Sequence, residues 1–456
     1  MAEKVDLRGR TLLVSGFHAP ERGSVEVLRD GLITVGTDGR IEAVLRPGDS
    51  GYQPLLGKAR RAGTLVTLPA GVVLVPGFVD LHVHAPQYPQ LGRALDVPLE
   101  VWLHRYTFPL EARYADPAFA ARVYRRLVSD LLSAGTTTAL YFGTIHVEAT
   151  CLLADICLEK GQRALVGKVA MDEPRSCPDY YRDASPAAAL EGTRAVIDHI
   201  RGHSGNRDRR VRPVVTPRFI PACTDATLEG LGTLARECDC HVQTHCSESD
   251  WAHAHVLERH GMTDAASLDR FGLLGHGSVL AHGNFLTGDD MDLLAARRSA
   301  VAHCPVSNAY FAGAVFPLRA ALEKGVRVGL GTDISGGPIG SVFEAMRAAV
   351  MVSRMLETGV DPALPPARRS VISGARIDFR EAFHLATAGG GDALGLPVGR
   401  FAPGCHFDAI AIDPAAENGT IRLWDDGLDE DVLQTLLYTA SKSNITGVWV
   451  DGAQVA

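Results

Sequence analysis

The sequence predicts an α/β protein in which a (β/α)8 TIM barrel interrupts a small β-sandwich domain that is built from both chain ends. Two patterns predict this fold. Within residues 76–390, strand-like apolar runs alternate with helix-like runs eight times, as in parallel βα units. Within residues 1–75 and 391–456, short apolar runs are separated by turns instead. We therefore expect the barrel to lie between the N-terminal half and the C-terminal half of one sandwich.

The two end segments supply the strands of the small domain. Their strand-like runs are Thr11–Ser15, Leu32–Val35, Ile41–Val44, Phe407–Ile412 and Val448–Gly452, with a turn at Gly36–Gly39. Each run is short, rich in aliphatic residues and bounded by polar residues or glycine, as strands of small β-domains are. We expect the last two runs to rejoin the sheet that the first three begin.

The central segment contains eight candidate barrel strands. They are Phe78–His84, Thr136–Ile145, Ala164–Met171, Val211–Phe219, His241–Glu248, Val279–Asn284, Ala300–Ser307 and Val326–Ile334. Helical patterns lie between them at Pro117–Leu132, Thr224–Arg236, Asp289–Arg297 and Ser341–Leu356. In a barrel of this kind the active site lies at the carboxyl ends of the strands, so the residues at those ends are the candidates for function.

The composition is that of a globular enzyme. At 456 residues, with 46% hydrophobic and 21% charged residues, the chain can bury a large core. A formal net charge of −8 argues against a nucleic-acid partner. No apolar run reaches the ~18 residues needed to span a bilayer, and the N-terminus lacks the features of a signal peptide. Nine cysteines without a regular framework indicate reduced thiols, so we expect a cytoplasmic enzyme that acts on a small molecule.

Candidate metal ligands stand at the ends of four of these strands. His82 and His84 are two residues apart on the first strand, so both imidazoles point to the same side and can reach one ion. His245, His282 and Asp333 lie at or near the ends of the fifth, sixth and eighth strands. A lone buried histidine is more often a hydrogen-bonded core residue, but five such side chains at one end of a barrel indicate a divalent metal that also handles water.

Other residues limit this interpretation. His253 and His255 have the same spacing, but they lie in a helix-like run where the two side chains diverge. His303 could bind the metal, but a structural role, or a role in orienting one of the ligands, is at least as well supported. A second metal would usually need a bridging ligand, often a carbamylated lysine. The end of the fourth strand has no lysine, and Lys168 is the only lysine on a candidate strand, so we predict one metal.

Two carboxylates are placed for proton transfer. Glu248 lies three residues after His245, where the strand turns into its loop, and from there it can face a water on the metal without binding the metal. The alternative for Glu248 is a carboxylate in the first turn of a helix. Asp333 could both touch the metal and take a proton from its water, because the glycines around it let the backbone approach closely.

The chain resembles the mononuclear metal-dependent deaminases of the amidohydrolase superfamily. The motifs that carry the resemblance are Pro-Gly-Phe-Val-Asp-Leu-His-Val-His (76–84), Thr-His-Cys-Ser-Glu (244–248), Ala-His-Gly (281–283), Ala-His-Cys-Pro-Val-Ser-Asn (302–308) and Gly-Thr-Asp (331–333). More narrowly, the segments Ala85–Tyr88, Trp102–Pro109, Val215–Phe219 and Gly331–Gly337 are similar to those of the guanine deaminase family. The metal motifs are shared by many deaminases, so the narrower resemblance depends on the second group of segments.

The resemblance implies a ligand set and a substrate pocket. One zinc ion would be held by His82, His84, His245 and Asp333, although the same donors accept iron(II). The residues implied in substrate binding are His84, Ala85, Pro86, Gln87, Arg218, Phe219, His245, Glu248, His282 and Asp333. The residues implied in catalysis are Glu248, Asp333 and His282. These roles make chemical sense, because arginine can donate to an O6 carbonyl, glutamine offers a donor and an acceptor, and phenylalanine can stack on a purine.

The implied activity is the hydrolytic deamination of guanine at C2, a step of purine catabolism that gives xanthine and ammonia. A homodimer is implied by the family alone. The alternative within the same chemistry is a deaminase of a related aminopurine, a pterin or an ammeline-like aminotriazine. The alternative from another class is a catalytically inactive relative that serves as a scaffold. Such a protein would typically lack ligands, whereas this chain keeps all five together with Glu248.

Overall fold

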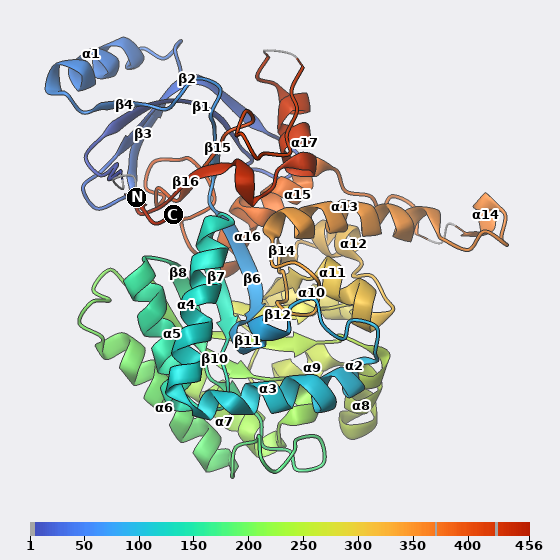
Figure 1. The fold of residues 1–456 in the computed structure, drawn as a ribbon. Coiled ribbons are helices and arrows are strands. Elements are labelled where there is room, and N and C mark those ends of the chain that lie inside the picture. Colours follow the sequence, from blue (N-terminus) through green and yellow to red (C-terminus); the bar gives the residue numbers. More distant parts are fainter. Residues whose placement is uncertain (1–4, 370–371, 425–426) are drawn as a thin grey trace.

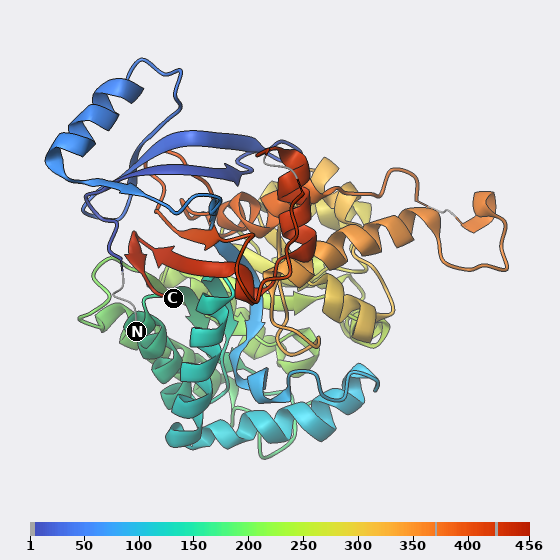
Figure 2. The same ribbon diagram turned by 45° about the horizontal axis from the view of Figure 1, so that its top comes forward.

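The computed structural model describes residues 5–369, 372–424 and 427–456, in which a barrel carries a smaller sheet at one side (Figure 1). The chain starts in the small sheet, builds the barrel and then returns, so the blue and red ends of the ribbon lie side by side (Figure 2). Backbone hydrogen bonds join the two ends, with Leu7 N donating to Gly452 O at 2.8 Å. This confirms the prediction that the barrel is inserted into a module made from both chain ends.

Eight parallel strands form the barrel sheet. They are β6 (Phe78–His84), β7 (Thr136–Phe142), β8 (Arg163–Gly167), β10 (Val211–Pro217), β11 (His241–Cys246), β12 (Ser278–His282), β13 (Ala300–His303) and β14 (Arg327–Leu330), and the short β9 (Val169–Ala170) also pairs with β10. The sheet closes between its last and first strands, where a parallel bridge joins Ile334 to Val83 and Asp333 N donates to His82 O at 2.9 Å. The closure brings the ends of β14 and β6 together.

Every candidate barrel strand is present, but most of them end earlier than the apolar run suggested. The run Ala300–Ser307 is a strand only to His303, because Pro305 lacks a backbone N–H for the ladder and instead begins the short helix α11 (Pro305–Ser307). The run Val326–Ile334 leaves the strand after Leu330. These shortened ends place the residues that follow them in the loops at the carboxyl mouth of the barrel.

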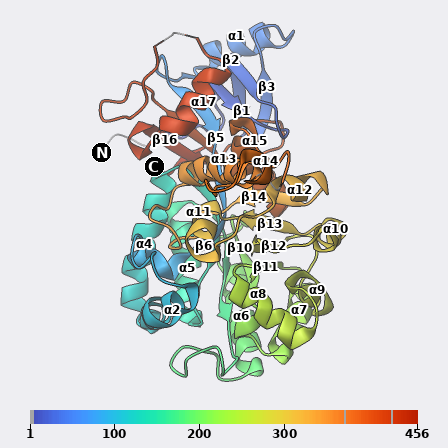
Figure 3. The same cartoon turned by 90° about the vertical axis from the view of Figure 1, so that its right-hand side faces the viewer.

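Helices cover the outside of the barrel (Figure 3). The main ones are α4 (Pro117–Ser133), α5 (Val147–Lys160), α6 (Pro186–Gly202), α7 (Asp225–Glu237), α8 (Asp250–His260), α9 (Asp264–Arg270), α10 (Gly288–Arg297), α12 (Leu318–Glu323), α13 (Val342–Thr358), α15 (Phe379–Ala386) and α16 (Ala388–Leu394). The four predicted helices correspond to α4, α7, α10 and α13. The N-cap of α10 is a capping box between Thr287 and Asp290, which satisfies free backbone N–H groups at the helix start.

The small domain is one mixed sheet with the strand order β17-β16-β15-β5-β1-β2-β3, and β4 pairs with β1. Its strands are β1 (Thr11–His18), β2 (Glu26–Val35), β3 (Ile41–Leu45), β4 (Leu65–Thr67), β5 (Val73–Pro76), β15 (Ala409–Ile412), β16 (Ile445–Val450) and β17 (Ala453–Gln454). The antiparallel pairing of β15 with β5 joins the two halves. Two helices in these segments, α1 (Tyr52–Ala62) and α17 (Glu430–Thr439), were not predicted.

The small sheet contacts the amino ends of the barrel strands, away from the candidate ligands. Arg163, the first residue of β8, donates to Asp408 Oδ2 at 3.1 Å and to Asp451 Oδ1 at 2.7 Å. Inside the barrel, aliphatic side chains such as Leu81, Leu140 and Leu165 form a buried cluster, so the barrel is a packed core and not a pore. No helix in the described part of the chain is long and apolar enough to cross a membrane.

The remaining short elements lie in loops. Those after β6 are η1 (Ala85–Gln90), α2 (Leu99–Trp102), η2 (Leu103–Thr107), α3 (Phe108–Ala112) and η3 (Arg113–Ala115). Further along the chain are η4 (Ile220–Ala222), η5 (Asn308–Ala312), α14 (Pro366–Arg369) and η6 (Lys442–Asn444). The long connection from β6 to α4 is therefore helical over much of its length, and it supplies one wall of the pocket described below.

Candidate active site

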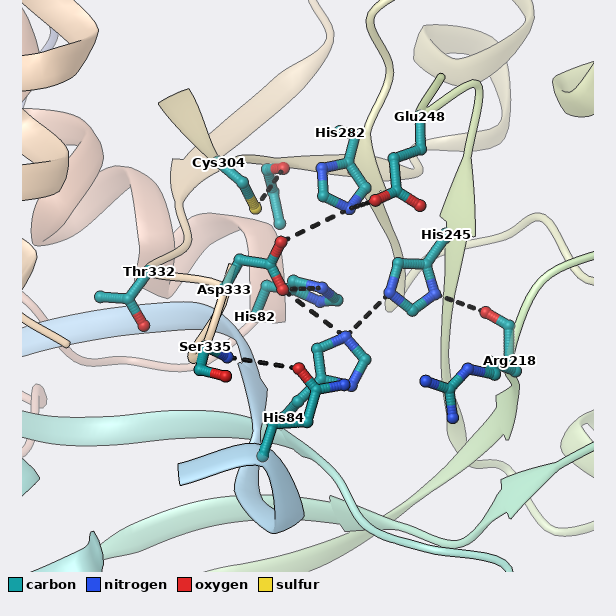
Figure 4. Close-up of polar contacts among 12 residues, drawn as sticks. His82, His84, Arg218, His245, Glu248, His282, Cys304, Thr332, Asp333 and Ser335 are labelled. Carbon is teal, nitrogen blue, oxygen red and sulfur yellow. Dashed lines mark hydrogen bonds and ion pairs between the residues drawn. The ribbon is translucent and has the colours of Figure 1, made fainter. Parts of the chain in front are cut away.

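Four imidazoles and one carboxylate meet at the carboxyl mouth of the barrel (Figure 4). His82 and His84 come from the end of β6, His245 and His282 come from β11 and β12, and Asp333 follows β14. All five side chains are buried. Their ligand atoms form two groups that share His82, one with His245 and His282 and the other with His84 and Asp333. The five residues predicted from separate strands are therefore brought together.

The distances within this cluster are those of side chains that face a common centre. Asp333 Oδ1 lies 3.2 Å from His82 Nε2 and 3.5 Å from His84 Nε2. His84 Nε2 lies 2.9 Å from His245 Nε2. The other carboxylate oxygen, Asp333 Oδ2, lies 3.9 Å from His282 Nε2. Asp333 thus turns one oxygen toward the β6 histidines and the other toward His282.

Hydrogen bonds on the outer side of two rings fix which nitrogen faces the cluster. His245 Nδ1 lies 2.5 Å from the carbonyl oxygen of Arg218, and His282 Nδ1 lies 2.9 Å from Asn308 Oδ1. Both partners are acceptors, so each Nδ1 carries the proton and each Nε2 turns a lone pair into the cluster. This is the arrangement by which proteins orient histidine ligands of a metal.

The electrostatics also suit a metal. Burial lowers the pKa of His82, and burial together with neighbouring imidazoles holds the pKa values of His84 and His245 well below the usual range. The rings are therefore neutral near pH 7, with lone pairs available. The buried atoms His82 Nε2 and His282 Nε2 have no hydrogen-bond partner within the described residues. Orphaned nitrogens beside a carboxylate fit a divalent cation with nitrogen and oxygen ligands.

Asp333 is held in place by its backbone and by a second carboxylate. Its φ of 49° lies in the left-handed region, which non-glycine residues rarely adopt. Asp80 Oδ1 accepts from Thr332 N at 3.0 Å and Oδ2 accepts from Thr332 Oγ1 at 2.6 Å, which ties the loop after β14 to β6. A Cβ on Gly331 would lie 2.8 Å from His82 Cβ. Only glycine therefore allows this backbone to approach the first ligand strand so closely.

Glu248 faces the cluster from the loop between β11 and α8. Its Oε1 atom lies 3.6 Å from His282 Nε2, and its side chain is almost fully buried. Burial raises the pKa of Glu248, and the neighbouring His282 acts against that increase. Glu248 precedes the N-cap residue Ser249 of α8 and lies outside the helix. A carboxylate that faces the ligands, and not the helix start, fits proton transfer better than stabilisation of a helix dipole.

A pocket opens from the cluster toward the loops after β6 and β10. Among its lining residues are His84, His245, Glu248 and Asp333 from the cluster, and Gln87, Arg218 and Phe219 from the predicted substrate site. Sequence reasoning missed the other part of the lining, which includes Leu99, Trp102, Leu103, Ser307 and Phe311. The apolar members come from α2, η2 and η5, so these loops give the pocket hydrophobic walls.

Glu111 is the main polar residue that sequence reasoning missed. It is fully buried in α3, where Oε2 accepts from Arg218 Nη1 at 2.6 Å and Oε1 accepts from Gln87 Nε2 at 2.9 Å. It follows the segment Trp102–Pro109, which carries part of the resemblance, and that position is the only signal in the sequence. The 107 residues that separate it from Arg218 gave no means of pairing the two.

Four other residues named from the sequence lie outside the centre of the site. Ala85 and Pro86 are buried at the start of η1 and are not among the described residues that line the pocket. His303 packs its ring against Phe316, and neither of the two ligand groups includes it. Lys168 Nζ donates to Asp183 Oδ1 at 2.7 Å, so it is engaged away from the cluster. The presence of one metal stays a prediction.

Comparisons with known proteins agree with this geometry. A family model described as the Amidohydrolase family matches residues 73–455. The guanine deaminase of Homo sapiens is 36% identical over 441 residues, which cover 94% of this chain and 93% of that protein. The crystal structure of guanine deaminase from C. acetobutylicum with bound guanine matches with a TM-score of 0.85 and 29% identity, covering 98% of this chain and 99% of that chain. An adenosine deaminase structure from Xanthomonas campestris with bound zinc matches with a TM-score of 0.79 and 26% identity, covering 98% and 93%.

Proposed function

This chain belongs to the amidohydrolase family and within it to the guanine deaminases, and from this premise we propose that it hydrolyses guanine at C2 to xanthine and ammonia. One observation carries the proposal: a single pocket is lined both by the histidine and aspartate cluster and by Gln87, Arg218 and Phe219. A guanine ring held by the second group would lie against the first.

The metal we propose is one zinc ion held by His82, His84, His245 and Asp333. Neutral imidazoles and a carboxylate are donors that zinc prefers, and the solved relative from Xanthomonas campestris contains zinc. When bound, such an ion lowers the pKa of a coordinated water toward ~7 and so supplies the nucleophile for hydrolysis. The chain itself provides the proton transfers and the orientation of the substrate.

The proton transfers fall to Asp333 and Glu248. Asp333 Oδ2, the oxygen that faces away from the β6 histidines, accepts the proton of the attacking water. Glu248 protonates the ring nitrogen beside C2, which makes that carbon more electrophilic. Asp333 then passes the proton taken from the water to the amino group, the C2–N bond breaks and ammonia leaves, and the added hydroxyl returns its proton to Glu248 as the C2 carbonyl forms. His282 Nε2 lies 3.6 Å from Glu248 Oε1 and 3.9 Å from Asp333 Oδ2, and in the form that carries a proton on this nitrogen as well as on Nδ1, His282 donates to the oxygen that adds to C2 and stabilises it.

Three side chains orient the purine. Phe219 offers a face for stacking, and its ring also lies 6.2 Å from that of His245, next to the reacting centre. Arg218 donates to the O6 carbonyl, an acceptor that guanine has and adenine lacks. Gln87, three residues after His84 on the same segment, pairs with the polar edge of the ring. Together they bring C2 toward the cluster.

A panel of amino-substituted heterocycles tests the proposal. Purified protein of known metal content is incubated with guanine, adenine, cytosine, ammeline and a pterin, and ammonia release is followed for each. We expect guanine to react with the highest kcat/KM and to give xanthine in equal amount. A faster reaction with ammeline or the pterin would assign the site to a different substrate class.

A further inference from the structure

Glu111 holds both polar side chains that face the purine, although it has no role in the mechanism above. Its Oε2 atom accepts from Arg218 Nη1 at 2.6 Å, and its Oε1 atom accepts from Arg218 Nη2 at 3.2 Å and from Gln87 Nε2 at 2.9 Å. All three side chains are buried. One carboxylate therefore links residues from η1, α3 and the end of β10.

The contact with Glu111 decides which edge of the Arg218 guanidinium remains for a ligand. A guanidinium has five N–H donors in one plane, and Glu111 takes one from each Nη atom. Nε–H donates to none of the described residues. The guanidinium carbon lies 5.0 Å from the centre of the Phe108 ring, which supports the plane from one side. Arg218 is thus fixed as a donor with its Nε edge available.

The same carboxylate determines how the Gln87 amide is turned. Nε2 donates to Glu111, and Oε1 accepts from Ser335 N at 3.3 Å. The opposite orientation would place the amide oxygen against a carboxylate and the NH2 group against a backbone N–H. Glu111 and the Ser335 backbone therefore fix the positions of the donor and the acceptor that Gln87 presents to the pocket.

Charge gives a second reason for a carboxylate at this position. Arg218 is buried, and a buried guanidinium without a counter-ion is strongly unfavourable. Glu111 compensates the charge, so the guanidinium can meet a neutral carbonyl oxygen without needing an anionic ligand. An amino group at C6 of a purine would instead turn its N–H donors toward the N–H donors of Arg218.

We propose that Glu111 is a positioning residue that makes the pocket selective for purines with an oxo group at C6. The selectivity acts through Arg218 and Gln87, because Glu111 fixes the donor edge of the first and the amide orientation of the second. This inference rests on the proposed function, since it assumes that O6 of the substrate meets Arg218. A purely structural ion pair would, when removed, affect all substrates alike.

The test compares two substrates that differ at C6. Guanine and 2-aminopurine both carry the amino group at C2, but only guanine carries O6. For Glu111→Gln we expect kcat/KM for guanine to fall about 10²-fold, mainly through KM, because a site built to bind a polar group loses most when its partner is misplaced. For 2-aminopurine we expect a change below about 3-fold, since Arg218 has no carbonyl to meet.

Glu381→Gln is the matched control. Glu381 forms a similar fork, with Oε1 and Oε2 each 2.7 Å from a nitrogen of Arg319, but it lies at the start of α15 and away from the pocket. We expect no change in the ratio of the two kcat/KM values for this variant. Metal content is measured in parallel, and Glu111→Gln should retain its metal because Glu111 touches none of the ligands.

Two further measurements keep the inference testable if Glu111→Gln does not fold or if 2-aminopurine reacts too slowly. Glu111→Asp keeps the charge and should show a smaller loss of selectivity in the same direction. Calorimetric binding of hypoxanthine and of unsubstituted purine, which release no ammonia, should show that the variants weaken only hypoxanthine. Equal losses for both ligands, or no loss for either, would overturn the role of Glu111. Failure of the wild-type protein to deaminate guanine would overturn the proposed function instead, and the binding comparison would still decide the role of Glu111.

Discussion

His245 and Arg218 are joined by a hydrogen bond of 2.5 Å, from the imidazole Nδ1 of the first to the backbone carbonyl oxygen of the second. The main chain of Arg218 orients a proposed metal ligand, while its side chain lines the pocket where the purine would bind. The loop after β10 therefore positions the metal site and the recognition site together. A shift of this loop would disturb both, which is why variants of single side chains are more informative than changes of its backbone.

Replacement of one proposed ligand should abolish metal binding. Replacement of a histidine in the other His-x-His pair, His253 and His255, should not. In His82→Ala we expect the metal content to fall from about one ion per chain to near zero, because the proposed site would lose one of its four protein ligands. His255→Ala is the control, since His255 lies on α8 with its ring 6.3 Å from that of Trp251 and belongs to neither ligand group. Elemental analysis of the dialysed proteins measures both, and metal retained in full by His82→Ala would remove this residue from the ligand set.

The side chain of Glu248 should matter for turnover and not for metal binding. For Glu248→Gln we expect kcat on guanine to fall ~10²-fold or more, because the amide cannot transfer a proton to the ring. Metal content should remain that of the wild-type protein. Glu258→Gln, an exposed residue of α8, is the control and should leave kcat unchanged. Near-normal turnover of the Glu248 variant would exclude the assigned role.

Loss of the Phe219 ring should weaken substrate binding more than it slows the chemistry. For Phe219→Ala we expect KM for guanine to rise about 10-fold with a smaller change in kcat, as a stacking contact worth ~1.4 kcal/mol would give. Phe285→Ala is the matched control, since Phe285 also packs against a histidine, His253, but outside the pocket. Steady-state kinetics at several guanine concentrations separate KM from kcat. An unchanged KM in Phe219→Ala would show that the purine does not stack on this ring.

The contact between the barrel and the small sheet should give a stability that depends on pH. Asp451 accepts from Arg163 at 2.7 Å and from His406 Nδ1 at 2.5 Å. Although burial acts to raise it, these two neighbours lower the pKa of Asp451 below its usual range. A carboxylate of this kind adds stability above its unfolded pKa of about 3.9 and loses that contribution as the pH falls through its lower folded value.

For Asp451→Asn we therefore expect a loss of about 3 kcal/mol in the free energy of unfolding that is constant between pH 5 and 7. The difference from the wild-type protein should shrink below about pH 4. Urea unfolding at several pH values measures it. Asp269→Asn, which breaks the more exposed ion pair with Arg297, should lower the free energy of unfolding by at most about 1 kcal/mol. An equal cost for the two variants would mean that the Asp451 contact is no stronger than a surface pair.

Local patterns made the barrel and most of the ligand cluster predictable. The alternation of strands and helices depends on neighbouring residues, so all eight strands could be placed from the apolar runs. Residues two apart on a strand point to the same side, so the shared direction of His82 and His84 could be predicted without the rest of the chain. Strand ends were less predictable, because Pro305 stops one run that looks continuous in sequence and another leaves the strand after Leu330, before the left-handed backbone at Asp333.

Contacts between distant segments could not be predicted. Glu111 and Arg218 pair across 107 residues, and no local pattern indicates that a buried glutamate in α3 serves a residue after β10. The apolar wall contributed by Trp102 and Phe311 likewise depends on how two loops meet above the barrel. The placement of Ala85 and Pro86 against substrate, the homodimer and the cytoplasmic location stay predictions.

The most direct test of the central claim is a titration of metal-free protein with zinc while xanthine and ammonia are measured from guanine. If each chain has one metal site, activity should be absent without metal, rise in proportion to added zinc and stop rising at one ion per chain. Xanthine and ammonia should be formed in equal amounts. Full activity in metal-free protein, or a rise that continues to two ions per chain, would contradict a single metal centre built from His82, His84, His245 and Asp333.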